Sequence, residues 1–248
     1  MRRLFPEPKP VSPEDAYASL GLADRAREDR PYVIANMVAT VDGRATVAGR
    51  TKQISSDADR ALFHALREQV DAVMVGTGTI AIERYGPLVR DPERSRRRAD
   101  RGLAPEPLAV TASRSLELPV DTALFQTPEA RIVVLTNSDR EAPPTSAQVT
   151  IERFDGDLDL LRGLETLRRK HDVRTVLLEG GPTLLGAMFE AGAVDELFLT
   201  LAPLIVGGGP EVGLIEGAAL PEPLGLGLVS VLEDEGHLFL RYAAGADD

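Results

Sequence analysis

The sequence predicts an α/β protein with a mostly parallel sheet, covered by helices on both faces, and an antiparallel hairpin at its C-terminal edge. Two observations support this fold class. Apolar, β-rich runs alternate with helical patterns from about residue 31 to 205, which is typical of parallel strands joined by helical crossovers. Near the C-terminus, two β-rich runs flank Asp234-Glu235-Gly236, and this arrangement signals a hairpin.

The predicted elements follow one another without an internal repeat or a convincing domain linker. Residues 1–30 are polar, Pro-rich and charged, so we expect an arm with one short helix at about 13–22, followed by a single domain over 31–248. Strands are expected within 31–39, 71–79, 107–113, 131–137, 175–181, 195–206 and 226–243. Helices are expected at 55–69, 157–172 and 181–193, a charged loop at 91–107 and a turn-rich segment at 113–130.

Composition excludes several function classes. The chain has 248 residues and no cysteine, which excludes disulfides, thiolate nucleophiles and cysteine-based zinc sites. The formal net charge of −11 argues against a nucleic-acid or anionic-membrane partner. No stretch approaches the ~20 apolar residues of a membrane span, and the N-terminus lacks the apolar core of a secretory signal. We therefore expect a cytoplasmic protein.

Two glycine-rich turns follow predicted strands. In VMVGTGT, residues 73–79, Gly76 and Gly78 lie where a strand passes into a helix, and backbone amides at such a turn can bind phosphate. A tight strand-to-helix turn without a ligand explains this motif equally well. In LLEGGPTLLGAMFEAG, residues 177–192, Pro182 stands at the first helical position after two glycines. This second motif is also a candidate phosphate cradle.

Other polar positions give weaker signals. Glu179 ends a buried strand, where a carboxylate is costly unless it serves a function. Asn36, Thr40 and Asp42 in NMVATVDGR could be functional, although a strand that ends at an Asp-Gly turn is the simpler interpretation. The basic stretch 94–101 is expected to be a solvated loop, with a phosphate-binding role as the alternative.

The sequence offers no arrangement for metal or nucleophilic catalysis. The three histidines, His64, His171 and His237, have no metal-ligand spacing, and neither a catalytic triad order nor a Gly-x-Ser-x-Gly elbow is present. We expect no metal. Chemistry that needs few protein groups remains, and hydride transfer fits because the cofactor carries the reactive atom.

Taken together, these motifs resemble one family, the pyrimidine reductases of riboflavin biosynthesis. The resemblance covers about residues 31 to 243 and is most specific in EGGPTL and in VDEL…APLIVGG. The VGTGT turn with the segment Ile80–Pro87 is most similar to the stand-alone actinobacterial type. The resemblance implies a dihydrofolate-reductase-like three-layer α/β/α fold, NADPH as hydride donor and a homodimer. The implied reaction reduces the ribosyl group of 5-amino-6-(5-phosphoribosylamino)uracil to ribityl.

The resemblance also implies roles for individual residues. It makes Glu179, Glu83 and Asp42 the candidate catalytic groups, and the candidate substrate-binding residues are Asn36, Thr51, Arg67 and Arg90. Ala39 would contact the nicotinamide through its backbone, and Ser113 with Arg114 would lie beside the adenosine phosphate. The full set of implied cofactor-binding residues is Ala39, Gln53, Gly76, Gly78, Thr79, Ser113, Arg114, Gly180, Gly181, Pro182, Thr183, Leu184 and Gly186.

The chain departs from the family pattern near the substrate. Asn36 stands where a lysine is frequent, Gln53 where an aromatic residue is frequent, and Glu83–Pro87 in place of an Asp-Asp-Pro segment. These differences leave NADPH use intact but keep other substrates open, namely dihydrofolate or another small C=N or C=O compound. A non-catalytic NADP-binding module is the alternative from a different class. No cysteine could supply the zinc ligands of a fused deaminase domain, so we expect no deaminase activity.

Overall fold

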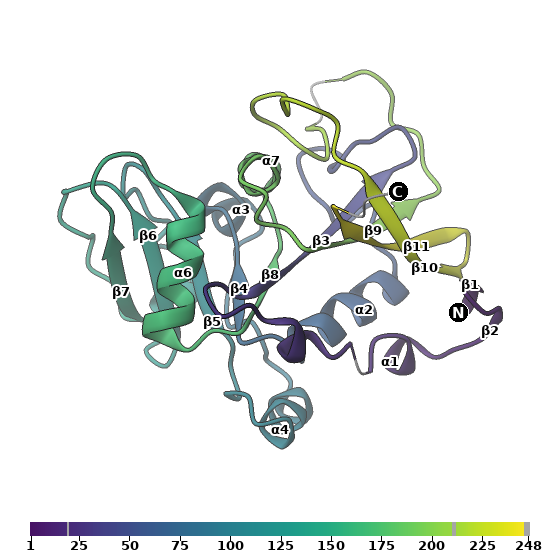
Figure 1. Cartoon of the computed structure of the whole chain (residues 1–248), viewed down its shortest axis with the longest axis horizontal. Coiled ribbons are helices and arrows are strands. Elements are labelled where there is room, and N and C mark those ends of the chain that lie inside the picture. The colour runs from purple at the N-terminus through teal and green to yellow at the C-terminus, as the bar shows by residue number, and fades with distance from the viewer. Residues whose placement is uncertain (19, 210–211, 246–248) are drawn as a thin grey trace. The chain divides into compact units, whose positions relative to one another are not determined.

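The structure is a computed structural model that describes residues 1–18, 20–209 and 212–245. The chain divides into two compact units, which we describe one at a time (Figure 1). Unit 1 comprises Met1–Leu20, Val33–Leu66 and Pro182–Asp248, and unit 2 comprises Gly21–Tyr32 and Arg67–Gly181. The division into an arm of residues 1–30 and a domain of 31–248 stays a prediction.

Unit 2 is built on parallel strands, as the alternating pattern predicts. Its strands are β4 (Ala72–Met74), β5 (Leu108–Ala112), β6 (Arg131–Thr136), β7 (Gln148–Arg153) and β8 (Thr175–Leu178). They lie in the order β8-β4-β5-β6-β7, and each runs parallel to its neighbours. Every side chain of β4 and β8 is buried, so these strands form the centre of the core of unit 2. Strand β7 was not predicted from the sequence.

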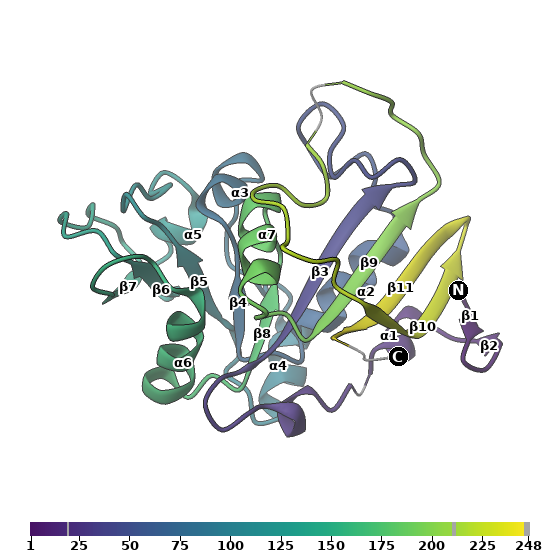
Figure 2. The same ribbon diagram turned by 45° about the horizontal axis from the view of Figure 1, so that its top comes forward.

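The helices of unit 2 are η1 (Leu22–Arg25), α3 (Thr77–Ile82), α4 (Pro92–Asp100), α5 (Ala123–Gln126) and α6 (Leu160–His171). Helix α6 confirms the helix predicted at 157–172. Its N-cap Asp159 accepts hydrogen bonds from the amides of Leu161 and Arg162. Gly163 brings the helix close to β6, because a Cβ atom there would lie 2.7 Å from Leu135 Cδ1. Figure 2 shows α6 beside these strands.

Helix α4 corrects the sequence prediction, which placed a loop over residues 91–107. Asp91 caps the helix by accepting a hydrogen bond from the Glu93 amide at 2.9 Å, and Pro92 occupies the first turn. The helix was missed because its face toward the protein carries Arg98 and no apolar stripe, so the periodicity that usually identifies a helix is absent.

Unit 1 combines one parallel strand pair with antiparallel strands. Its strands are β1 (Arg2–Phe5), β2 (Lys9–Pro10), β3 (Tyr32–Thr40), β9 (Glu196–Ala202), β10 (Leu226–Asp234) and β11 (His237–Ala244). Their order is β2-β1-β10-β11-β9-β3, with β3 and β9 parallel and the other neighbours antiparallel. The predicted hairpin is confirmed as β10 and β11. It turns at Glu235-Gly236, both at positive φ.

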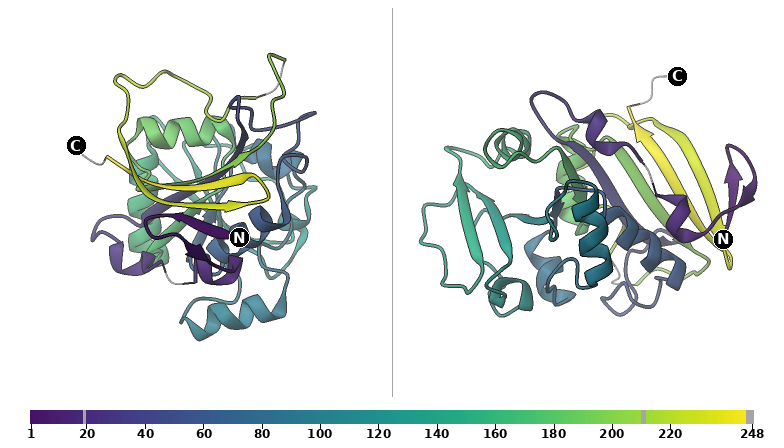
Figure 3. Two further views of the ribbon diagram at one scale, coloured as in Figure 1. Left: turned by 90° about the vertical axis from the view of Figure 1, so that its right-hand side faces the viewer. Right: turned by 90° about the horizontal axis from the view of Figure 1, so that it is seen from below.

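The first part of the N-terminal arm, Met1–Leu20, belongs to unit 1. Strand β1 pairs with β10, which continues the antiparallel strands beyond the hairpin (Figure 3). Neither β1 nor β2 was predicted. The helix expected at 13–22 is shorter, since α1 ends at Ala16 and residue 19 lies outside the described residues.

Helices α1 (Pro13–Ala16), α2 (Asp57–Arg67) and α7 (Pro182–Glu190) complete unit 1, except that Arg67 counts with unit 2. Phe198 and Thr200 lie on one face of β9, because alternate residues share a face. Tyr17, just after α1, packs edge-on against Phe198 at 5.1 Å between ring centroids. Asp59 of α2 accepts a hydrogen bond from Thr200 at 2.6 Å. The short helix of the arm and α2 therefore cover the same face of β9.

Candidate active site

The two glycine-rich turns lie at the same edge of unit 2. Strands β4 and β8 are parallel neighbours, with Met74 opposite Leu178, so their carboxyl ends lie side by side. The Gly76 amide donates a hydrogen bond to the Gly180 carbonyl at 2.7 Å. Ligands of α/β sheets bind at the carboxyl ends of strands. This edge is therefore the candidate ligand site of unit 2.

Two of the glycines at this edge, Gly180 and Gly181, meet conformational or steric constraints. A Cβ atom on Gly181 would lie 2.6 Å from the Thr79 hydroxyl oxygen, closer than real Cβ atoms come. Gly180 has a φ of 84° and forms a cis peptide with Gly181. A Cβ atom on Gly78 would meet no atom within 4 Å, so the protein's own packing does not require glycine there. Open space above a first-turn amide suits a phosphate group.

Glu179 ends β8 and is held by two other side chains of unit 2. Arg67 donates from Nε to Glu179 Oε1 at 2.6 Å and from Nη2 to Oε2 at 2.7 Å. The Tyr85 hydroxyl donates to Glu179 Oε2 at 2.8 Å. The carboxylate is 1% exposed and the guanidinium side chain 9%. The sequence predicted that a buried carboxylate at Glu179 would be costly without a function, and this bidentate pair compensates the buried charge.

Electrostatics favour the cationic form of Arg67 and the protonated form of Tyr85. Burial favours a lower pKa for Arg67, but the charge and hydrogen bonds of Glu179 outweigh burial, and the pKa is raised. Burial, and then the Glu179 charge, raise the pKa of Tyr85 well above its usual value. Arg67 stays cationic and Tyr85 stays protonated at neutral pH. The sequence did not single out Tyr85, whose only signal was its place in a segment unlike the family pattern.

The loop after α3 presents Arg90. Arg67 Nη1 donates to the Leu88 carbonyl at 2.7 Å, and the partly buried carboxylate of Glu106 accepts hydrogen bonds from the amides of Leu88 and Val89. Burial raises the pKa of Glu106. Among the described residues, Arg90 makes no hydrogen bond or ion pair, and its side chain is exposed. Of the two arginines predicted to bind a substrate phosphate, Arg90 is exposed, whereas Arg67 is buried and donates from all three guanidinium nitrogens to Glu179 and Leu88.

The remaining predicted residues of unit 2 lie near the ends of α3 and β5. Glu83 caps the C-terminus of α3 and is partly exposed. Ser113 follows β5 and is buried, and its carbonyl accepts a hydrogen bond from the Thr136 hydroxyl at 2.6 Å. Arg114 is exposed. Since β5 and β4 are parallel neighbours, Ser113 lies at the same edge of the sheet as Gly76.

In unit 1, Asp42 fixes a loop. It accepts hydrogen bonds from the Thr40 hydroxyl and from the amides of Val206 and Gly207, the last at 2.7 Å. The Thr40 hydrogen bond, followed by that from Gly207, lowers the pKa of Asp42. The carboxylate therefore joins the segment after β3 to the segment after β9.

The other predicted residues of unit 1 lie on β3, after it and on α7. Ala39 is buried on β3 and Asn36 is partly buried, while Thr51 and Gln53 precede α2. The first turn of α7 contains Pro182, Thr183 and Leu184. Gly186 has a packing role, because a Cβ atom there would lie 2.3 Å from the Glu216 carbonyl oxygen.

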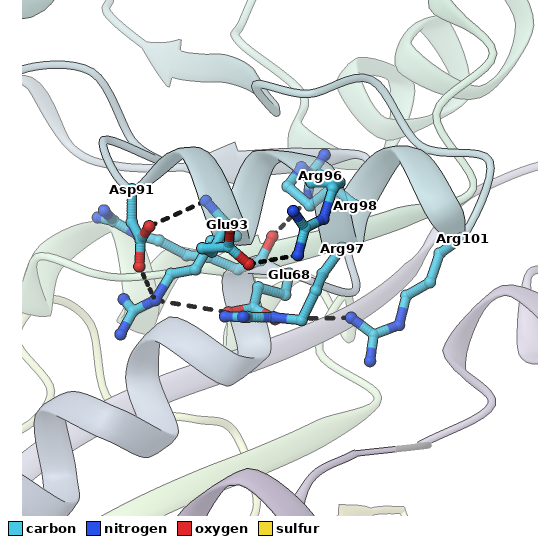
Figure 4. A network of polar contacts seen from close by, with 9 residues as sticks. Glu68, Asp91, Glu93, Arg96, Arg97, Arg98 and Arg101 are labelled. Atoms are coloured by element: carbon cyan, nitrogen blue, oxygen red, sulfur yellow. Dashed lines mark hydrogen bonds and ion pairs between the residues drawn. The ribbon is translucent and has the colours of Figure 1, made fainter.

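The basic stretch 94–101 is engaged with acidic groups of unit 2 (Figure 4). Arg97 makes a bidentate pair with Glu68 at 2.6 and 2.7 Å. Arg94 and Arg101 approach the same carboxylate at 3.5 and 3.6 Å. Arg98 is fully buried and donates to the carbonyls of Ala104, Val70 and Arg67. These contacts join α4 to residues 67–70 of the same unit.

The described residues contain neither a candidate metal cluster nor a candidate membrane-spanning helix. No group of three or more His, Asp or Glu side chains in them could hold a metal ion. No helix over the same ranges is long and apolar enough to cross a membrane.

Comparison with known proteins identifies the family. Residues 31–239 match the family model described as the RibD C-terminal domain. The chain belongs to this family. A relative with this domain is riboflavin biosynthesis protein RibD of Mycobacterium tuberculosis, 34% identical over 186 residues, which are 74% of this chain and 45% of that protein. The chain thus spans about half the length of that relative.

A second relative is matched over most of its length. The 2,5-diamino-6-ribosylamino-4(3H)-pyrimidinone 5′-phosphate reductase of Methanothermobacter thermautotrophicus is 30% identical over 203 residues, 78% of this chain and 87% of that protein. Among solved structures, a pyrimidine reductase-like protein of Corynebacterium diphtheriae superposes with a TM-score of 0.79 at 24% identity. The superposition covers 96% of this chain and 100% of the other. It confirms the predicted fold class.

Proposed function

We propose that this member of the RibD C-terminal domain family is an NADPH-dependent reductase. Its substrate is 5-amino-6-(5-phosphoribosylamino)uracil, whose ribosyl group it reduces to ribityl. The observation that supports this proposal best is the edge of unit 2 at which Gly76, Gly180 and Gly181 meet beside Glu179. The names of the relatives support the substrate class. We further propose that the protein works in the cytoplasm as a homodimer.

The backbone at this edge fits a dinucleotide. Gly78 leaves space over the first turn of α3, where amides without an intrahelical partner favour an anion. Ser113 and Arg114 stand at the end of β5, so we assign them the adenosine phosphate. When bound, NADPH supplies a hydride. The chain's task is to hold donor and acceptor carbons at ~3–3.5 Å and to exclude water.

Different side chains of unit 2 have different proposed roles toward the substrate. Arg90 binds the substrate phosphate, because a guanidinium with available donors favours bidentate contacts with phosphate. Arg67 and Glu179 hold one another and position Tyr85 and Leu88. Reduction of the open-chain imine carbon also needs one proton on the adjoining nitrogen. We assign delivery of that proton to the partly exposed Glu83, since both oxygens of Glu179 already accept hydrogen bonds from Arg67 and Tyr85.

The other assignments are proposals that rest on the family resemblance. Asp42 acts by fixing its loop. Substrate contacts are further assigned to Asn36 and Thr51. Cofactor contacts are assigned to Ala39, Gln53, Thr79, Pro182, Thr183, Leu184 and Gly186.

The Arg90 assignment can be tested with Arg90→Ala. Loss of a charge-assisted contact worth about 1.5–3 kcal/mol should raise KM about 10- to 100-fold for the phosphorylated substrate. KM for the dephosphorylated form should change little. The measurement is initial rates of NADPH oxidation, with Arg131→Ala, an exposed position on β6, as the matched control. Equal effects on both substrate forms would exclude Arg90 as the phosphate ligand.

The same assay separates the alternatives. Wild-type turnover of dihydrofolate in preference to the pyrimidine would replace the proposed substrate. Saturable NADPH binding without turnover of any candidate would identify a binding module in place of an enzyme.

A further inference from the structure

Tyr85 holds a fixed position at the carboxyl end of β8. Its hydroxyl lies 2.8 Å from Glu179 Oε2, and its ring lies 5.6 Å from the Arg67 guanidinium carbon. Its amide donates to the Ile80 carbonyl at 3.1 Å, and its carbonyl accepts from the Leu124 amide at 3.0 Å. Contacts on both sides of the backbone and at the hydroxyl therefore fix the side chain.

The hydrogen bonds of Glu179 determine whether the Tyr85 hydroxyl can donate to a ligand or accept from it. Glu179 pairs with Arg67 and accepts at both oxygens, so it has no proton to donate. Tyr85 must direct its single hydroxyl proton to this carboxylate. The phenol oxygen keeps its lone pairs, and a donor that is bound to a carboxylate becomes a better acceptor. Toward any ligand, Tyr85 can therefore only accept.

We propose that Tyr85 is a specificity-determining residue whose oxygen accepts a hydrogen bond from a hydroxyl or amino group of the substrate. The inference rests on the proposed function, because it places the substrate at the edge formed by β4 and β8. Tyr85 is partly exposed and lies at that edge through its contact with Glu179. A group that is only an acceptor, such as a carbonyl or a phosphate, is disfavoured there.

This assignment gives Glu179 an indirect role. The Glu179 carboxylate accepts the hydroxyl proton of Tyr85. The Tyr85 oxygen is thereby left to accept a hydrogen bond from a donor group of the ligand. This assignment also separates two recognition tasks within unit 2. Arg90 takes the anionic end of the substrate, and Tyr85 takes a neutral donor group. A free pyrimidine that lacks a phosphate, a ribityl or ribosyl hydroxyl and an amino group would make neither the contact with Arg90 nor the contact with Tyr85.

The test is Tyr85→Phe, which keeps the ring and removes the hydroxyl. Tyr32→Phe is the matched control, because Tyr32 is also in unit 2 and its hydroxyl contacts Arg25. Both proteins are assayed with 5-amino-6-(5-phosphoribosylamino)uracil and with analogues that each lack one donor, namely the 2′-deoxyribosyl, 3′-deoxyribosyl and 5-deamino forms. NADPH affinity is measured by fluorescence titration.

Tyr85→Phe should raise KM for the complete substrate about ten-fold, with NADPH affinity unchanged. Wild-type protein should lose about ten-fold in kcat/KM on one analogue, and Tyr85→Phe should not distinguish that analogue from the complete substrate. A purely structural role would lower activity on all substrates equally, and that result would overturn the inference. Unchanged kinetics in Tyr85→Phe would overturn it as well. If wild-type protein reduced no pyrimidine, the proposed function would fail first and the inference with it.

Discussion

At the residue scale, the buried ion pair between Arg67 and Glu179 sets the electrostatics at the end of β8. The two residues are separated by 112 positions in the chain and make two hydrogen bonds of 2.6 and 2.7 Å. Neither side chain has more than a tenth of its surface exposed. Burial of such a pair has a desolvation free-energy cost for both ions. Each buried charge is therefore stable only while its partner is present.

Arg67→Met should therefore lower the free energy of unfolding by about 3–5 kcal/mol, because it leaves the Glu179 carboxylate buried beside Tyr85 without its cation. Urea denaturation at pH 7 measures the change. The double variant with Glu179→Leu should lose less than the sum of the two single changes. Arg114→Met, at an exposed position, should stay within about 0.5 kcal/mol of wild type. A change below about 1 kcal/mol for Arg67→Met would contradict the buried pair.

Only part of this cluster could be predicted from residues alone. Glu179 stood out because a carboxylate follows a strand of buried apolar residues. Its partners could not be found by spacing, since Tyr85 is 94 residues away and lies in a segment without periodicity. The sequence also predicted a substrate contact for Arg67, whereas its donors go to Glu179 and the Leu88 carbonyl. Such competition between partners depends on the tertiary structure.

At the scale of elements, the first part of the N-terminal arm, Met1–Leu20, is an integral part of unit 1. Its strand β1 pairs with β10, and the Met1 amino group lies 3.0 Å from Asp234. Beyond β1 lies only the two-residue β2, Lys9–Pro10, and a short strand with lysine and proline discourages further strand pairing. Strands β1 and β2 of the arm thus form the last strands at this end of the strand order of unit 1 and protect its edge from further pairing.

Tyr17 is a buried aromatic residue of the arm, and Tyr17→Ala tests its contribution to stability. The ring is 4% exposed and packs edge-on against Phe198, so the change should cost about 3–5 kcal/mol of unfolding free energy. Phe5→Ala is the matched control from the same arm, because Phe5 is 43% exposed and should cost under about 1 kcal/mol. Chemical denaturation of both variants provides the comparison. Equal and small effects would show that the arm is dispensable.

The elements that were missed share a physical reason. Strands β1 and β2 and helix α4 lie near the end of the strand order or outside the apolar core, so their residues carry little periodicity. Strand β7 is an edge strand with a single fully buried residue, so its apolar signal is weak. Helix α4 is held within unit 2 by the ion pairs of Glu68 and by Arg98, which donates to the Val70 carbonyl. By contrast, β3, β4, β8 and β9 were predicted because full burial requires continuous apolar, β-branched runs.

At the scale of the whole molecule, alternation of strands and helices predicted the fold class, and the match to the Corynebacterium diphtheriae structure confirms it. The glycine-rich turns predicted the candidate site, since β4 and β8 are parallel neighbours with Gly76 bonded to Gly180. The identity of the substrate could not be read from the sequence, because it depends on a few side chains whose contacts form only on folding.

Isotope transfer tests the central claim, direct hydride transfer from NADPH to the ribosyl carbon, most directly. The protein is incubated with 5-amino-6-(5-phosphoribosylamino)uracil and NADPH carrying deuterium at one or the other C4 position, and the product is analysed by mass spectrometry and NMR. The account predicts one deuterium at C1 of the ribityl chain from one of the two labelled cofactors and none from the other. Unlabelled product from both, deuterium at another carbon, or no reduced product would contradict it.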